Sequence, residues 1–350
     1  DFRPSLSFHF DEVFDIVANE VKNIQNNVGL TEVNGFNRFE ISGPDANGFV
    51  ERIFCGNITQ KSGRVSLGYL LNDLGMIKSE ATISNIPASD RGPKRMWYGS
   101  AAASEFHDMD WLEQNINTDE DVEIRSLTND QTILLIAGPK AREVLSKCSR
   151  EDWSKEAFPW LSIRECFIGF SAATVMSVSF SGELAYEVNV ESDNGNFMWE
   201  KIMEIGQEFK IQPYGTEALS TLRIEMGHVA GSELDGRTIP YDNSLEGLLS
   251  KKKDFIGKRS LSRKAFTVED RQKVVGVVPL DKKTSIPEGS HLVKDSNAPL
   301  PNPKLGYISA SCWSVEHNNP FSLAILKNGK NMIGEKLFVM SPLKNKVIPV

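Results

Sequence analysis

Three charged side chains stand in settings where they could do chemistry, and Glu80 is the first. Alternating apolar and polar residues over 77–83 predict a strand with Glu80, Lys78 and Thr82 on the face opposite the apolar side chains. On pattern alone this polar face is solvated. If it faces a cleft instead, the Glu80 carboxylate can take up a proton or stabilise a cation.

Glu183 is the second candidate. It enters a predicted strand directly after Gly182, and apolar side chains then alternate at Leu184, Tyr186 and Val188. A glycine in a strand permits close approach by another backbone or by a ligand. A carboxylate beside it can accept two hydrogen bonds from a planar N–C–N edge, as in a pterin or a guanine.

Arg223 is the third candidate. It lies in a predicted helix over about 216–226, with Leu219, Leu222 and Met226 facing inward. An arginine in this position usually pairs with a neighbouring acid. Otherwise its planar guanidinium suits the carboxylate of a ligand.

The elements that must position these residues begin with a recurring unit. A strand at 39–41 leads through Gly43-Pro44 into a helix, and a strand at 132–137 leads through Gly138-Pro139 into another. The recurrence predicts two similar α+β units packed together. Further helices are predicted over about 11–27 and 196–209.

The texture changes after about residue 265. Short strands are predicted near 275–280, 305–310, 321–326 and 337–339, with an Asn328-Gly329 turn and punctuating prolines and glycines. This pattern predicts an antiparallel C-terminal β domain, with a barrel as its expected form. The boundary falls within Lys251–Arg263, so the expected domains are residues 1–262 and 263–350.

Composition argues against several classes of protein. The 350 residues carry a net charge of −8, which disfavours a nucleic-acid partner. Apolar runs such as Thr132–Ala137 are far shorter than the ~20 residues of a membrane helix. Four widely separated cysteines imply neither a metal site nor a disulfide framework, and predict a reducing compartment.

Several standard sites are missing from the sequence. No dinucleotide-binding, phosphate-loop or zinc-protease motif is present. The five histidines form no close-spaced ligand set, so each is expected to be structural, and His107-Asp108 is expected to be a capping or surface pair. The chain begins at Asp1 rather than Met, which favours processing or excision from a longer protein.

Several stretches together resemble the tetrahydrofolate-binding aminomethyltransferase family, whose founder is the glycine cleavage T protein. The sequence SGELAYE at 181–187 is similar to the family signature S/T-G-E-x-x-Y/F-E. Further matching stretches are PYGTEA at 213–218, LRIE at 222–225, DGRTIP at 235–240, KKKDFIGKRSL at 251–261, LGYI at 305–308 and SCWS at 311–314.

Two branches of this family are especially similar. The second half of the chain resembles the C-terminal module of the α subunit of heterotetrameric sarcosine oxidase. The first half resembles the C-terminal halves of dimethylglycine and sarcosine dehydrogenases, through Gly99-Ser100, His107-Asp108, Trp111-Leu112 and residues 149–159.

The resemblance implies a fold and a set of roles. The expected fold is α+β and three-lobed, with two related α+β lobes and a β-barrel lobe around a central folate channel. Glu183 matches the glutamate that hydrogen-bonds the pterin ring, and Glu80 falls at the T protein's key aspartate. Arg223 matches a helix arginine near the folate, and Tyr69 lies in the segment that lines the folate pocket.

The chain departs from the T protein at three positions. Phe180 replaces a tyrosine that contacts folate, Leu219 replaces an arginine, and Glu80 is one methylene longer than aspartate. These differences weaken the case for a lipoyl-bound aminomethyl group as substrate. They place the chain nearer to the dehydrogenase and oxidase branches.

The implied reaction is tetrahydrofolate-dependent one-carbon transfer. In the dehydrogenase and oxidase relatives a flavin domain oxidises an N-methyl amine, and the folate domain captures the carbon as 5,10-methylenetetrahydrofolate. Glu80 would accept a proton and Glu183 would orient the ring. No flavin site is expected within this chain, so a separate flavin-containing domain or subunit is the expected partner, in the cytoplasm or, in a eukaryote, the mitochondrial matrix.

Three alternatives remain at this point. The chain could be a folate-dependent demethylase of another methylated compound, such as a sulfur compound. It could be a non-catalytic folate-binding protein of the iron–sulfur maintenance branch, although residues 231–235 lack the cysteine of that branch's motif. It could also be a scaffold for a flavin domain, which measurable folate binding would distinguish.

Overall fold

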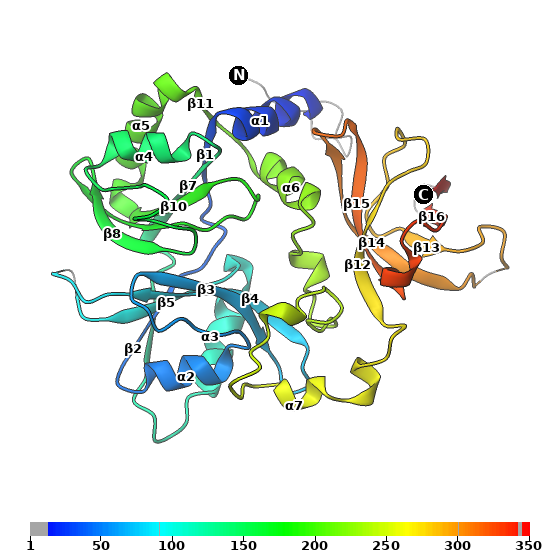
Figure 1. Cartoon of the computed structure of the whole chain (residues 1–350), viewed down its shortest axis with the longest axis horizontal. Helices are drawn as coiled ribbons and strands as arrows, with labels where there is room; N and C mark the ends of the chain where they lie inside the picture. The colour runs from blue at the N-terminus through cyan, green and yellow to red at the C-terminus, as the bar shows by residue number, and fades with distance from the viewer. Residues whose placement is uncertain (1–12, 91, 300, 342–344) are drawn as a thin grey trace.

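The computed structural model describes residues 13–90, 92–299, 301–341 and 345–350. In this part of the chain the strands form three sheets, which build three lobes with a long segment running between them (Figure 1). The mixed α+β class is therefore confirmed. Asp1 and the first two residues of the helix predicted over 11–27 lie outside the described residues.

Lobe 1 is a five-stranded sheet in the order β3-β4-β5-β2-β6, with α2 and α3 as its helices. Helix α2 begins after the Gly43-Pro44 turn and buries one face against the sheet. The bounds are β2 Phe39–Ser42, α2 Ala46–Ile53, β3 Arg64–Leu71, β4 Ile77–Ile86, β5 Arg95–Gly99, α3 Glu105–Gln114 and β6 Glu123–Ser126.

Lobe 2 is a six-stranded sheet in the order β11-β1-β7-β10-β9-β8. Helices α4 and α5 pack on one face, and α1 and α6 pack on the other. The bounds are α1 Phe14–Asn26, β1 Val28–Glu32, β7 Gln131–Ala137, α4 Ala141–Cys148, β8 Ile163–Ile168, β9 Ser171–Met176, β10 Ala185–Glu191, α5 Gly195–Gly206, β11 Ile211–Pro213 and α6 Thr216–Glu225.

The two lobes share one strand order. Strands β2 to β5 of lobe 1 occupy the places that β7 to β10 occupy in lobe 2. The helix after each Gly-Pro turn buries residues at the same i, i+3, i+4, i+7 spacing, which are Ala46, Phe49, Val50 and Ile53 in α2 and Ala141, Val144, Leu145 and Cys148 in α4. The recurrence seen in the sequence thus corresponds to a repeated topology.

The lobes also exchange a strand. β1 precedes β2 in the chain but pairs with β7 of lobe 2, and β6 precedes β7 but pairs with β2 of lobe 1. The two connecting segments meet where they cross, since the Leu127 amide donates to the Arg38 carbonyl at 2.7 Å. Each lobe is therefore completed by a strand from the other half of the chain.

The Gly138-Pro139 turn requires glycine. Gly138 has φ +126°, and a Cβ there would lie 2.6 Å from two carbonyl oxygens, those of Ile24 and Asn27. We expect Gly138→Ala to lower the free energy of unfolding by about 2 kcal/mol, because the strained backbone conformation and the close contacts add up. Urea unfolding of the variant measures this loss.

A matched control is available in α2. Gly48 is exposed, and a Cβ there would meet no atom within 4 Å. Alanine favours a helix interior over glycine, so Gly48→Ala is expected to leave stability unchanged or raise it by up to about 1 kcal/mol. Equal effects of the two substitutions would contradict the role given to Gly138.

The C-terminal lobe is a six-stranded sheet in the order β12-β15-β14-β13-β16-β17. One backbone hydrogen bond, from the Leu280 amide to the Pro349 carbonyl at 2.9 Å, joins the segment after β12 to β17. A closed barrel is not confirmed. The bounds are β12 Gln272–Val277, β13 His291–Val293, β14 Lys304–Ser314, β15 Asn319–Lys327, β16 Phe338–Ser341 and β17 Lys346–Pro349.

The segment between α6 and β12 connects the lobes. Its short helix α7 (Lys258–Leu261) packs on lobe 1, where Phe255 and Leu261 are buried against Leu71 and Ile77. Within the described residues no helix is both long and apolar enough to cross a membrane.

Candidate functional site

Tyr69 and Glu80 lie side by side on adjacent strands. They are register partners in the antiparallel β3–β4 pair, which places both side chains on the same face of the sheet. The buried Tyr69 hydroxyl donates a hydrogen bond to Glu80 Oε1 at 3.3 Å. Burial, followed by the Glu80 charge, raises the pKa of Tyr69, so this hydroxyl keeps its proton and remains a donor.

The Glu80 side chain is hydrogen-bonded to Tyr69 and also partly exposed to solvent. The burial pattern of β4 alternates from Ile77 to Ala81 as the sequence predicted, and the Glu80 side chain is 35 % exposed. Tyr69 and His228 both approach Oε1. The second oxygen, Oε2, makes no hydrogen bond or ion pair among the described residues. Glu80 is thus a carboxylate fixed through one oxygen with the other available.

His228 faces Glu80 from the segment after α6. Its Nε2 lies 3.7 Å from Glu80 Oε1, which is an ion pair when the ring is protonated. The ring packs edge-on against Phe180, with centroids 4.8 Å apart and an interplanar angle of 63°. The sequence suggested only a structural histidine here, and its one signal was its place five residues after the candidate Arg223.

Glu183 ends a tight turn that leads into β10. Ser179 Oγ donates to the Glu183 carbonyl at 2.7 Å and accepts from the Gly182 amide at 2.9 Å. Gly182 has φ +84°, and a Cβ there would overlap Met226 Sδ at the end of α6. The positive φ therefore favours glycine before Glu183, and a Cβ there would also require the exposed Met226 side chain to move.

The Glu183 carboxylate has no partner among the described side chains and amides, although it is only partly exposed. Burial raises the pKa of this carboxyl, and the negative charges of Glu316 and Glu225 raise it further. Such a group gains from any ligand that brings N–H donors, because a desolvated carboxylate without hydrogen bonds is costly.

Arg223 pairs with an acid. Its Nη1 lies 3.1 Å from Oε2 of the fully buried Glu233 and donates to the His228 carbonyl at 3.2 Å. Glu233 Oε2 also accepts from the Ala230 amide at 3.0 Å. Of the two possibilities left open by the sequence, the structure contains the acid pair, and this pair anchors the segment that carries His228.

Lobe 1, lobe 2 and the segment after α6 supply the residues of this region, and the C-terminal lobe packs beside it. β4 belongs to lobe 1 and the 179–183 turn to lobe 2, while α6 lies between them and the C-terminal lobe (Figure 1). Glu225 of α6 accepts a hydrogen bond from the Val315 amide at 2.6 Å, which fixes the β14–β15 turn beside α6. We call Tyr69, Glu80, Phe180, Glu183 and His228 the central cluster.

Asp108 is buried rather than at the surface. Its Oδ2 accepts hydrogen bonds from Ser79 Oγ at 2.9 Å, Tyr98 OH at 2.7 Å and Ser100 Oγ at 2.6 Å. The expectation of a capping or surface pair at His107-Asp108 is therefore wrong for the aspartate. Three donors on one carboxylate fix α3 against β4 and β5 behind Glu80.

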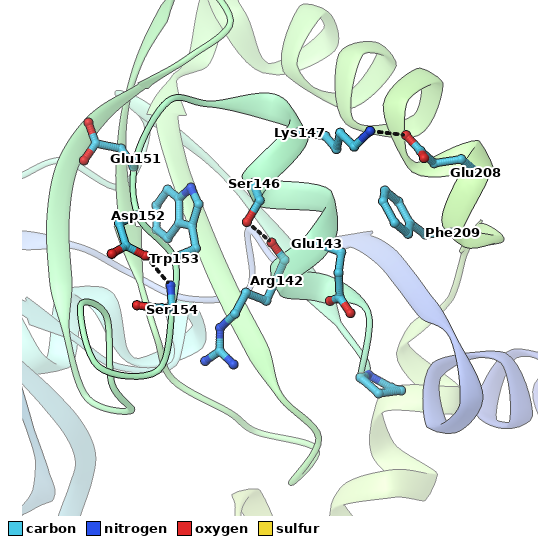
Figure 2. Close-up of a pocket in the computed structure, with 11 residues that line it drawn as sticks. Arg142, Glu143, Ser146, Lys147, Glu151, Asp152, Trp153, Ser154, Glu208 and Phe209 are labelled. Atoms are coloured by element: carbon cyan, nitrogen blue, oxygen red, sulfur yellow. Dashed lines mark hydrogen bonds and ion pairs between the residues drawn. The ribbon is translucent and has the colours of Figure 1, made fainter.

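A separate surface groove of about 670 Å³ lies on lobe 2. Figure 2 shows its lining side chains coming from α4, the 151–154 loop and the 3₁₀ turn Gln207–Phe209 that follows α5, with both charge signs present. None of the central cluster lines it. The groove is therefore separate from the Glu80 and Glu183 carboxylates.

Comparison with known proteins shows which family the chain resembles. The family model described as the GCVT N-terminal domain matches residues 2–253. The chain is 36% identical over 341 residues to the sarcosine oxidase subunit alpha of Rhizobium meliloti, covering 95% of the chain and 34% of the relative. It is 33% identical to the mitochondrial dimethylglycine dehydrogenase of Mus musculus, covering 75% and 30%.

Two further comparisons cover most of both proteins. The aminomethyltransferase of Chloroherpeton thalassium is 25% identical, over 95% of the chain and 88% of the relative. The crystal structure of aminomethyltransferase T from Bartonella henselae superposes with a TM-score of 0.80 at 18% identity, covering 95% of this chain and 87% of that one, which shows a shared fold.

The matched relatives differ from this chain in length. The chain spans about a third of the length of the sarcosine oxidase and dimethylglycine dehydrogenase relatives. Relatives named as aminomethyltransferase, sarcosine oxidase and dimethylglycine dehydrogenase are enzymes. Since the family match covers well over half of its residues, the chain belongs to the aminomethyltransferase-like family of the GCVT N-terminal domain.

Proposed function

We propose that this chain binds tetrahydrofolate and transfers to it a one-carbon unit from an N-methylated amine of the sarcosine or dimethylglycine type, giving 5,10-methylenetetrahydrofolate. The observation that carries the proposal is the Glu183 carboxylate, which is partly buried and lacks a partner among the described residues. A pterin presents two N–H groups on one planar edge, and these match the two oxygens of a carboxylate.

The neighbouring residues fit the same ligand. When bound, tetrahydrofolate supplies the nitrogen atoms that take up the carbon. Glu183 fixes the orientation of the ring, which is a proximity contribution. Phe180 precedes Glu183 in the same turn and packs against Phe36 and His228, so its ring excludes water beside the ligand.

Glu80 does the proton work in this proposal. Tyr69 holds Oε1, which leaves Oε2 to accept a proton from a ligand nitrogen as positive charge develops there. In this proposal Arg223 does not contact the ligand itself, since its Nη1 is held by Glu233 and by the His228 carbonyl. Arg223 instead keeps the 228–233 segment in place.

The donor of the carbon requires oxidation elsewhere. An N-methyl amine must lose two electrons before its carbon can be captured at this oxidation level, and flavin chemistry is suited to that step. The relatives named as sarcosine oxidase and dimethylglycine dehydrogenase are about three times as long as this chain. We propose a flavin-containing domain or subunit as the partner.

Glu183→Ala tests the proposal. We expect it to weaken tetrahydrofolate binding by at least about 100-fold, because it removes two charge-assisted hydrogen bonds worth about 1.5–3 kcal/mol each. Calorimetric titration under anaerobic, reducing conditions measures the affinity of the wild type and the variant.

Glu191→Ala is the matched control, since Glu191 is an exposed glutamate at the far end of β10. It is expected to bind tetrahydrofolate as the wild type does. Wild-type affinity in Glu183→Ala would remove Glu183 from the site. A folded wild-type chain that binds no tetrahydrofolate would overturn the proposed function and favour a scaffold role.

A further inference from the structure

A row of hydrogen-bonded side chains joins the buried Asp108 to the amine of Lys78. Asp108 Oδ2 accepts from three hydroxyl groups, and Oδ1, its other oxygen, lies 3.3 Å from His107 Nδ1. On the other side of the same ring, His107 Nε2 lies 2.7 Å from Lys78 Nζ. None of these three residues belongs to the central cluster, so the proposed function leaves the row unexplained.

The two contacts of the His107 ring fix its orientation. A carboxylate oxygen only accepts hydrogen bonds, so Nδ1 donates to Asp108. One proton then lies between Nε2 and Lys78 Nζ, because an ammonium and a doubly protonated ring are both donors and could not hydrogen-bond to each other. The ring is therefore placed to exchange a proton with the Lys78 amine.

The Lys78 amine is partly shielded from water. Its side chain is half-buried, and Nζ lies 5.8 Å from the centroid of the Trp111 ring on α3. Burial lowers the pKa of Lys78, and the charge of Asp108 opposes this change without reversing it. Near pH 7 a larger fraction of this amine is therefore neutral than in an exposed lysine, and the neutral amine has the lone pair that a nucleophile needs.

No acid forms an ion pair with Lys78 in the described part of the chain. Glu80 lies two residues away on β4, and its printed contacts are with Tyr69 and His228. Asp108 reaches Lys78 only through the His107 ring. The environment of Lys78 thus differs from that of a surface lysine paired with a carboxylate.

We propose that Lys78 is a nucleophilic amine that forms a reversible imine with a small aldehyde, and that His107 carries the proton for this step. The aldehyde approaches from the side of His107, whose side chain is 58 % exposed. Because Trp111 and His107 flank the amine, we expect the smallest aldehydes to react best.

The reaction needs neither an oxidant nor a reductant. The lone pair of Nζ forms a bond to the carbonyl carbon, and the electron pair of the C=O double bond moves to the oxygen. One proton of the amine passes through His107 Nε2 to that oxygen, which gives a carbinolamine. The second amine proton leaves with the hydroxyl group as water, and the C=N double bond of the imine forms.

The link to one-carbon transfer rests on the proposed function. Formaldehyde has the oxidation level of the carbon that 5,10-methylenetetrahydrofolate carries. An imine with formaldehyde would therefore hold this carbon on β4, two residues from Glu80. The imine itself forms without tetrahydrofolate, so it can be tested independently.

Reductive trapping with formaldehyde tests the amine in the full chain without tetrahydrofolate. The folded protein is exposed briefly to dilute formaldehyde at about pH 7, borohydride converts the imine to an N-methyl amine, and peptide mass spectrometry measures methylation at each lysine. Lys78 is expected to be methylated at least about tenfold faster than Lys61, an exposed lysine between α2 and β3, because more of its amine is neutral.

Two substitutions on α3 separate the role of the His107 ring from simple accessibility. His107→Gln removes the proton-carrying ring from an exposed position, so the variant should fold, and methylation of Lys78 is expected to fall to within about threefold of Lys61. Glu113→Gln, the matched control, changes another exposed residue of the same helix and should leave Lys78 as reactive as in the wild type.

Each result has a definite meaning. If Lys78 in the folded wild type is methylated no faster than Lys61, the inference is overturned. If His107→Gln leaves the fast methylation of Lys78 intact, the part given to His107 is wrong. Fast, His107-dependent methylation in a chain that binds no tetrahydrofolate supports the inference and refutes only the proposed function.

Discussion

Glu80→Gln is expected to lower the catalysed rate of 5,10-methylenetetrahydrofolate formation by at least about 100-fold, the usual contribution of a positioned general base. The carboxamide has the same size and can keep the hydrogen bond from Tyr69, but it cannot accept the proton. The rate is measured with formaldehyde as donor and the chain in excess over tetrahydrofolate, after subtraction of the uncatalysed reaction.

A binding measurement separates chemistry from affinity. In the proposed arrangement Glu183 orients the ring and Glu80 moves the proton, so tetrahydrofolate affinity in Glu80→Gln should stay within a few-fold of the wild type. Tyr69→Phe removes only the hydrogen bond to Oε1. We expect it to cost less than about tenfold in rate. A Glu80→Gln rate close to the wild-type rate would exclude Glu80 as the base.

Arg38→Ala is expected to lower the free energy of unfolding by about 3–5 kcal/mol, the cost of leaving one member of a buried ion pair alone. Arg38 is 3 % exposed and pairs with Glu187 of β10. It also donates to Asn189 Oδ1 at 3.2 Å and to the Asn37 carbonyl at 3.0 Å. These contacts join the strand-exchange crossing to lobe 2.

The loss should depend on pH. Burial raises the pKa of Glu187, and Arg38 opposes that rise. Without Arg38 the carboxyl would favour its neutral form in the folded state, so the folded-state pKa lies above the unfolded value. Stability is then retained at low pH and lost as pH rises through the folded-state pKa, so the destabilisation should be smaller at about pH 5 than at about pH 8.

Urea unfolding at both pH values measures this effect. The matched control is Arg125→Ala, since the Arg125–Asp130 pair is exposed at 64 % and 53 % and is expected to contribute less than about 1 kcal/mol. Replacing both Arg38 and Glu187 by apolar residues should recover most of the loss. Equal effects of Arg38→Ala and Arg125→Ala would contradict the role given to the buried pair.

Local pattern predicted much of the fold. The alternation around Glu80 gave its strand and its face, and the two Gly-Pro turns indicated the repeated unit. The strand exchange could not be predicted in this way. β1 and β7 are separated by about a hundred residues, and the alternation of apolar residues within a strand does not indicate which other strand it pairs with.

The site was predictable in part for the same reason. Tyr69 and Glu80 lie on the two strands of one hairpin, so their contact follows from their short separation in the sequence. His228 meets Glu80 only through the packing of α6 between the lobes, and a lone histidine has no local signal for that. An acid was predicted as the partner of Arg223, but not which one. Glu233 lies beyond a turn, and hydrophobic periodicity does not predict the path of a turn.

The exchange of β1 and β6 has a consequence for how the molecule can come apart. A single cut in the exposed turn at residues 117–119 would divide the chain between α3 and β6. The N-terminal piece would still hold β1 inside the sheet of lobe 2, and the C-terminal piece would still hold β6 on the sheet of lobe 1. The nicked protein would remain clasped, since separating the pieces requires both sheets to lose a strand at once.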